Sequence, residues 1–144
     1  MLYLSDVWPF VLWTSVAFSV SYMVQSLPEK EAPKPIPLRF WRSASGHEPV
    51  RDWLNGLTQD EKKVIGRDIA KVQYGWPVGL PVCRPLSGGL WEVRSSLPSR
   101  REARVLFGFH EGKLIALHAL VKTTQKTSPR DLALARTRLK EVRS

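Results

Sequence analysis

The chain has few of the residues from which metal sites and disulfide frameworks are built. Its 144 residues include one cysteine, Cys83, and three dispersed histidines: His47, His110 and His118. A single cysteine excludes a disulfide framework and a multi-cysteine zinc site, and scattered histidines indicate no histidine-rich metal cluster. The sequence also lacks a glycine-rich phosphate loop and a Ser-His-Asp spacing. We therefore expect no metal and no small-molecule cofactor, and no nucleophilic role for Cys83.

Acidic residues are also scarce. The chain has 13 Asp and Glu against 22 Lys and Arg, which gives a formal net charge of +9. Its hydrophobic fraction of 43% is large enough to form a core and excludes general disorder. Small basic globular proteins typically bind polyanions, so nucleic acid is the first candidate partner.

The first 22 residues contain no basic residue, and their only charge is Asp6. An uncharged run continues from Val7 to Pro28, near the lower length limit of a transmembrane helix. We favour the interpretation that residues 1–22 are an upstream in-frame extension and that translation starts at Met23. A membrane anchor and a loosely attached helix remain open, and membrane association is expected only if residues 7–28 are retained and insert.

Four prolines lie within residues 28–37, and such a composition predicts an extended, solvated linker. We accordingly divide the chain into an apolar N-terminal extension (1–27), a Pro-rich linker (28–37) and a folded domain (38–144).

Hydrophobic periodicity in the domain predicts the element order β-α-α-β-β-β-α. Thr58 and Glu61 have the spacing of a capping box, and Ser128-Pro129 is a typical helix start. The Pro- and Gly-containing stretch from Trp76 to Gly89 is interpreted as a loop. The predicted elements are a strand at 38–41, helices at 49–56 and 58–75, strands at 90–95, 103–109 and 114–121, and a helix from 128. This pattern indicates an α+β domain with a small antiparallel sheet, an N-terminal αα-hairpin and a C-terminal helix. Strict alternation is expected in the last strand, with Ile115, Leu117, Ala119 and Val121 on one face.

Three basic residues have the parity to share one face of this sheet: Arg94, Arg104 and Lys122. Three clustered cations repel one another unless an anion lies among them. We interpret the trio as a phosphate-binding face, while a solvated surface remains the alternative for each residue alone. The segment 120–144 adds seven basic and two acidic residues, which would steer the chain to RNA.

Four ordered stretches resemble the phage-derived, HigB-like branch of the RelE/ParE toxin superfamily of type II toxin–antitoxin systems. They are Gly89–Arg94 (GLWEVR), Arg104–Phe107 (RVLF), Leu117–Pro129 (LHALVKTTQKTSP) and Ala135. The similarity covers roughly Leu38 to Arg143.

The resemblance implies a RelE-like fold, a helix-turn-helix antitoxin partner and a cytoplasmic, ribosome-dependent mRNA endonuclease (mRNA interferase). In such toxins a 2′-hydroxyl attacks its own 3′-phosphate without a metal, giving a cyclic phosphate and a 5′-hydroxyl. Arg94 and Arg104 would neutralise the developing charge, because a guanidinium holds phosphate oxygens bidentately. Lys122 would bind phosphate or transfer a proton. Further RNA contacts are expected from basic residues in turns and near the C-terminus: Arg100, Arg101, Lys126, Arg136 and Arg138.

The chain departs from the family at Thr123, where a second lysine often stands, and the change would weaken catalysis or RNA affinity. Two alternatives stay open on the same fold: a ParE-like toxin that targets gyrase, and a degenerate, non-catalytic toxin that only binds its antitoxin. The catalytic hypothesis predicts that Arg104→Ala abolishes toxicity and leaves the fold intact.

Overall fold

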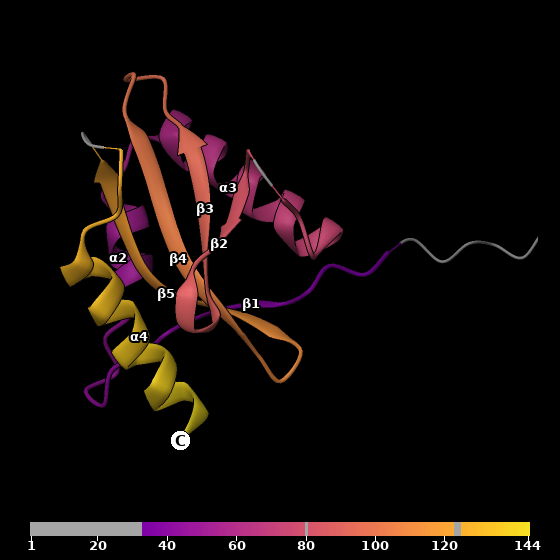
Figure 1. The fold of residues 1–144 in the computed structure, drawn as a ribbon. Helices are drawn as coiled ribbons and strands as arrows, with labels where there is room; N and C mark the ends of the chain where they lie inside the picture. Colours follow the sequence, from indigo (N-terminus) through magenta and orange to yellow (C-terminus); the bar gives the residue numbers. More distant parts are fainter. Residues whose placement is uncertain (1–32, 80, 123–124) are drawn as a thin grey trace, which may run out of the picture. The chain divides into compact units, whose positions relative to one another are not determined.

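The computed structural model describes residues 33–79, 81–122 and 125–144 (Figure 1). The predicted extension (1–27), the first part of the predicted linker and Thr123 lie outside these residues. The last linker residues are hydrogen-bonded to the domain: the amide of Ile36 donates to the carbonyl of Gln73 (2.8 Å), and that of Leu114 donates to the carbonyl of Pro37 (2.9 Å). Among the described helices, none is both long and apolar enough to cross a bilayer.

Five strands form one sheet in the order β1-β5-β4-β3-β2, with three helices packed on it (Figure 1). The strands are β1 (Leu38–Phe40), β2 (Cys83–Pro85), β3 (Leu90–Ser96), β4 (Glu102–His110) and β5 (Lys113–Lys122). The helices are α2 (Pro49–Asn55), α3 (Gln59–Gly75) and α4 (Pro129–Arg143), and a short 3-10 turn, η1, covers Ser87–Gly89. The α+β class, the helix pair and the C-terminal helix are as predicted.

The helix starts follow the local sequence signals. Thr58 and Glu61 form the complete capping box at the start of α3. The Ser128 hydroxyl accepts from the amide of Asp131 (3.1 Å) at the start of α4, where Pro129 occupies the first turn. Both arrangements satisfy backbone N–H groups that have no partner inside the helix.

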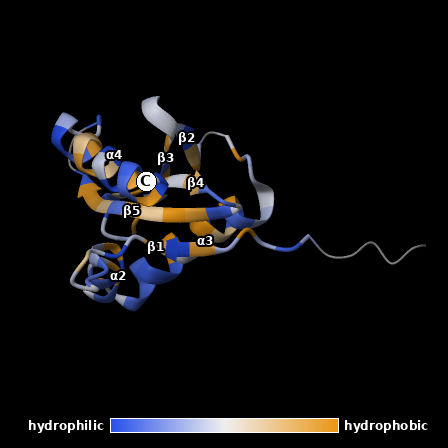
Figure 2. Ribbon diagram, turned by 90° about the horizontal axis from the view of Figure 1, so that it is seen from below, coloured by the Kyte–Doolittle hydropathy of each residue, from blue (hydrophilic) through white to orange (hydrophobic). Residues whose placement is uncertain are grey.

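The sheet separates two apolar clusters. Ile65, Ile69 and Val72 of α3 pack with one face of the sheet, including Val105 and Phe107. Ala135 and Leu139 of α4 pack with the opposite face, including Leu90, Leu106 and Leu117. Figure 2 shows α4 on one side of the sheet and α2 and α3 on the other.

Two details of the predicted sheet are wrong. The sheet is mixed, because β1 pairs parallel with β5 while all other pairs are antiparallel. This pairing joins Leu38 to Leu114, and local periodicity carries no information about such distant partners. In addition, the predicted loop 76–89 contains β2, a three-residue edge strand that ends in Pro85. A proline is tolerated at a sheet edge, although it weakens the sequence signal for a strand.

Strict alternation along β5 is also wrong. The register shifts by one residue between the pairs Leu106–His118 and Phe107–Ala116, so that Leu117 is the extra residue of a β-bulge. Ile115 and Leu117 therefore face α4, whereas Ala119 belongs to the α3 cluster. From His118 to Lys122 the even-numbered residues follow the α4 face.

Candidate functional site

The strand register brings the three predicted cations onto one face. Arg94 of β3 lies directly opposite Arg104 of β4. Lys122 of β5 lies opposite Glu102, two residues from Arg104 on the same side of β4. This end of the sheet lies next to the segment 125–128 that leads into α4.

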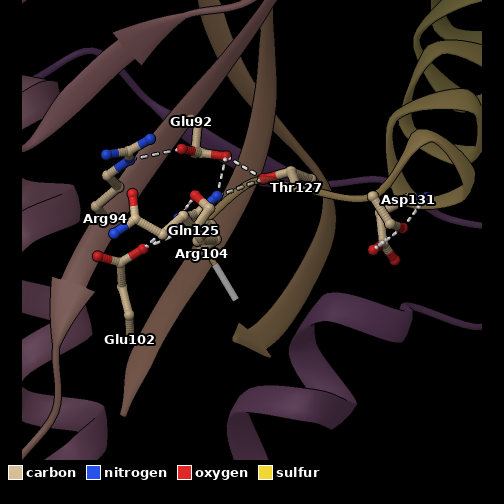
Figure 3. A network of polar contacts seen from close by, with 8 residues as sticks. Glu92, Arg94, Glu102, Arg104, Gln125, Thr127 and Asp131 are labelled. Carbon is tan, nitrogen blue, oxygen red and sulfur yellow. Dashed lines mark hydrogen bonds and ion pairs between the residues drawn. The ribbon is translucent and has the colours of Figure 1, made fainter. Parts of the chain in front are cut away.

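A carboxylate that the sequence reasoning did not select lies at the centre of this cluster. Glu92 is 1% exposed, and its Oε1 accepts from Arg94 Nε at 2.7 Å. Its Oε2 accepts from the Thr127 hydroxyl at 2.5 Å and lies 3.5 Å from the NH1 of Arg104 (Figure 3). Glu92 has the same parity as Arg94 in β3, so the alternation already placed the two side chains on one face.

Burial alone would raise the pKa of Glu92. The hydrogen bonds from Thr127 and Arg94 and the charge of Arg104 outweigh burial and hold the pKa below the usual 4.5. Glu92 is therefore ionised at neutral pH.

Arg104 is enclosed by partners. Its side chain is 3% exposed, and Nε and NH2 both contact Glu102 Oε1 at 2.7 Å. Its NH2 also donates to the carbonyl of Gln125 (2.7 Å), and NH1 donates to the Thr127 hydroxyl (2.8 Å). Thr127 thus accepts from Arg104 and donates to Glu92 through one hydroxyl (Figure 3).

Because of these contacts, Arg94 and Arg104 already have anions among them, contrary to the expectation that a phosphate would have to separate the three cations. Glu92 and Glu102 lie within the cluster and compensate Arg94 and Arg104 from inside the chain. No external anion is needed to stabilise the cations. Arg104→Ala would remove one of the two arginines that compensate buried Glu92, together with the donor to Thr127 and to the Gln125 carbonyl, so we expect this substitution to destabilise the fold rather than leave it intact.

Arg94 differs from Arg104 because it reaches solvent. Its side chain is 24% exposed, and within the described residues only its Nε has a partner. Figure 3 shows the Arg94 guanidinium at the margin of the network, joined to Glu92 by the contact from Nε. Arg94 lines a hollow of about 490 Å³ together with Arg67 and Asp68 of α3 and Glu102 of β4.

Lys122 is largely buried at the other side of the cluster. Burial and the charge of Arg104 lower the pKa of its ammonium group, and three nearby carboxylates, those of Asp131, Glu92 and Glu102, oppose this shift. A lysine in such surroundings releases its proton more readily than a free one.

A smaller hollow, of about 160 Å³, lies on the side of the segment 125–128. Leu86 and Leu132 form its apolar lining, and Arg84 and Lys126 are exposed cations on it. Lys126, one of the five predicted RNA contacts, thus lines a hollow beside the cluster.

The other predicted RNA contacts are Arg100, Arg101, Arg136 and Arg138. Arg101 pairs with Glu61 (2.8 Å), and Arg136 donates to the Ser87 hydroxyl (2.6 Å). Arg138 donates to the carbonyl of Leu117 (2.6 Å) and lies over the Trp41 ring, so it fastens α4 to β5. Arg100 is exposed in the β3–β4 turn with a positive φ of 60°.

His118 contributes to the start of α4 rather than only filling the edge of the core. Its Nε2 lies 2.8 Å from Asp131 Oδ1. Burial would raise the pKa of Asp131, but the contacts with Ser128 and His118 lower it.

Cys83 is buried, and burial raises the pKa of its thiol to about 11, so it is a poor nucleophile at neutral pH. In the described part of the chain, no three His, Cys, Asp or Glu side chains are arranged to hold a metal.

Residues 52–140 match the family described as "Phage derived protein Gp49-like (DUF891)". The match covers more than half of the chain. It includes the residues of the polar cluster around Glu92, namely Glu92, Arg94, Glu102, Arg104, Lys122, Gln125 and Thr127. No curated protein matches the chain. The chain therefore belongs to the phage-derived Gp49-like family (DUF891), a family associated with RelE-like toxins of toxin–antitoxin systems.

Proposed function

We propose that this protein is the toxin of a type II toxin–antitoxin system and cleaves mRNA on the ribosome in the cytoplasm. The reaction is attack of a nucleotide's 2′-oxygen on its adjacent phosphorus, with loss of the 5′-oxygen of the next nucleotide. Its products are a 2′,3′-cyclic phosphate and a free 5′-hydroxyl. Membership of the Gp49-like family supports a toxin, and the net charge of +9 supports an RNA substrate.

The observation that carries this proposal is the position of the Arg94 guanidinium, which is held at Nε by Glu92 and is partly exposed to solvent. An ionised, buried Glu92 holds the Nε edge of its guanidinium, no described residue is bonded to the two terminal nitrogens, and Arg94 lines the 490 Å³ hollow. A planar guanidinium with two free nitrogens binds two phosphate oxygens at once and opposes the charge that develops on them. Arg94 is thus suited to the phosphodiester in the transition state.

Lys122 is the second group of the proposed mechanism. Its lowered pKa suits a proton transfer to the leaving 5′-oxygen or from the 2′-hydroxyl. Arg104 supports both groups: it forms contacts to Glu92 and Glu102, and its charge acts on Lys122. Lys126 and Arg84, on the neighbouring hollow, are available for flanking phosphates. The proposed partner that neutralises the toxin is a small helix-turn-helix antitoxin.

The test is controlled expression of the chain followed by mapping of 5′ ends in cellular mRNA. We expect growth arrest with cuts in translated messages in the wild type, and loss of both in Arg94→Gln and Lys122→Gln. Lys113→Gln is the matched control, because Lys113 lies at the opposite end of β5 and is exposed.

Other outcomes of this experiment would overturn the proposal. Growth arrest with intact mRNA and damaged DNA would indicate a gyrase-targeting toxin. Absence of arrest, together with binding of the antitoxin encoded beside it, would indicate a degenerate toxin without catalysis.

A further inference from the structure

Protein stability alone does not explain why a carboxylate is buried at position 92. Removing a carboxylate from water carries a penalty of several kcal/mol, and well-packed apolar residues often replace a buried ion pair without loss of stability. Glu92 is 1% exposed and is surrounded by Arg94, Arg104 and Thr127. Such a group is suited to orienting a neighbour.

The neighbour that it orients is Arg94. The strand backbone fixes the position of the Arg94 Cα atom, but the arginine side chain can still rotate about several bonds. The 2.7 Å contact between Glu92 Oε1 and Arg94 Nε removes this freedom at the far end of the side chain. Because the guanidinium is planar, fixing its Nε edge also fixes the direction of its two terminal nitrogens.

Glu92 is itself held by the segment that precedes α4. The Thr127 hydroxyl has a single proton, which it donates to Glu92 Oε2 while it accepts from Arg104 NH1. The carbonyl of Gln125 accepts a second bond from Arg104. The segment 125–127 is thus bound to the cluster by a chain of contacts that leads from Arg104 through Thr127 and Glu92 to Arg94 (Figure 3).

We propose that Glu92 and Thr127 are positioning residues that aim the Arg94 guanidinium at the scissile phosphodiester, with Arg104 as the support of this chain rather than a phosphate ligand. The inference rests on the proposed function and deepens it. It assigns the phosphate contact to the one arginine of the pair that reaches solvent, and it gives the buried arginine a different task.

The experiment is single-turnover cleavage of a defined mRNA on purified ribosomes by full-length variants, with toxin concentration varied. The variants are Glu92→Gln, Arg94→Gln, their double variant, Thr127→Val and Thr127→Ser. Misorientation of Arg94 is expected to reduce the maximal rate about 10–100-fold. The half-saturating toxin concentration is expected to change little, because it reports binding of the toxin to the ribosome rather than the contact of Arg94 with one phosphate. Thr127→Ser keeps the hydroxyl and is expected to restore the rate, which Thr127→Val loses.

The double variant provides the decisive comparison. If Glu92 acts through Arg94, adding Glu92→Gln to Arg94→Gln causes no further loss of rate. Multiplying effects in the double variant, or wild-type rates in both Glu92→Gln and Thr127→Val, would overturn the inference while cleavage by the wild type left the proposed function standing.

A second measurement keeps the inference testable if the wild type does not cleave mRNA. The same five variants are then compared by their affinity for a single-stranded RNA oligonucleotide, with thermal unfolding to confirm folding. Non-additive losses for Glu92→Gln and Arg94→Gln, with rescue by Thr127→Ser, would support positioning of Arg94 for a phosphate. Additive losses, or no loss, would reject it.

Discussion

Arg94 and Arg104 are neighbours across two strands, have the same charge and face the same side of the sheet, yet their surroundings differ. Arg104 is closed in by Glu102, Gln125 and Thr127, whereas Arg94 is bound at Nε only, as far as the described residues go. Guanidinium groups that already donate to internal acceptors have few donors left for a ligand. The two residues are therefore expected to differ in what their removal does.

We predict that Arg104→Ala lowers the free energy of unfolding at pH 7 by roughly 3–5 kcal/mol, because it breaks a buried, hydrogen-bonded charge pair. Arg94→Ala is the comparison and is expected to cost less, about 1–3 kcal/mol, because Glu92 Oε1 also loses a partner there but water can reach the vacated position. Urea unfolding followed by circular dichroism measures both. Equal losses in the two variants would contradict the different roles.

The difference in free energy of unfolding between the wild type and Arg104→Ala is expected to depend on pH, and urea unfolding at several pH values measures it. The folded-state pKa of Glu92 lies below the usual 4.5, so its stabilising contribution is complete above pH 4.5 and is lost as the pH falls through the folded-state pKa. In Arg104→Ala that pKa rises towards its ordinary value or above it. The stability difference between wild type and Arg104→Ala is thus expected to narrow as the pH is lowered below 4.5.

At the scale of the elements, the bulge in β5 decides what lies under α4. One extra residue, Leu117, turns the apolar side chains Ile115 and Leu117 towards the α4 cluster while His118 remains in reach of Asp131. The same helix approaches β4 so closely that any side chain at Gly108 would displace Leu139. A Cβ on Gly108 would lie 2.5 Å from a methyl carbon of Leu139.

A pair of glycine substitutions tests this packing. Gly108→Ala is expected to lower the free energy of unfolding by about 1–3 kcal/mol, because buried Leu139 has to move. Gly66→Ala places the same methyl group on an exposed position of α3 with no atom within 4 Å, and is expected to raise it by about 0.4–1 kcal/mol. Thermal unfolding of the two variants provides the measurement. A stable Gly108→Ala protein would show that α4 packs more loosely on β4 than the structure indicates.

At the scale of the whole molecule, the positive charge is only partly available to a ligand. Many basic side chains have internal acceptors, among them Arg101, Arg104 and Arg138, so the net charge of +9 overstates the number of phosphates that they contact. Net charge still controls long-range attraction, whereas direct contacts control the salt dependence of binding.

We predict that the logarithm of the association constant for single-stranded RNA falls linearly with the logarithm of the salt concentration between about 50 and 200 mM. Each lost phosphate contact reduces the magnitude of this slope by about 0.7. Arg94→Gln removes one proposed phosphate contact and is expected to reduce the slope by that amount, whereas Lys113→Gln is expected to leave the slope unchanged. Fluorescence anisotropy with a labelled oligonucleotide measures this dependence. A slope near zero in the wild type would argue against an RNA ligand.

The elements and the face shared by Arg94, Arg104 and Lys122 followed from local patterns. Apolar spacing, the Thr58 capping box and the Ser128-Pro129 start are short-range features, because side-chain direction repeats with the backbone conformation of each element. Strand parity placed the three cations together for the same reason. It also placed Glu92 beside Arg94, but parity does not reveal which polar side chain will be buried.

The remaining properties depend on contacts between distant parts of the chain. The parallel partner of β1, the bulge at Leu117 and the role of Thr127 each join residues that are remote in sequence, and no local period encodes them. Burial and partner geometry, which exist only after these parts meet, make Arg104 an internal support and leave Arg94 at the surface. Local pattern thus specifies which side chains share a face, and tertiary packing specifies which of them water and a ligand can reach.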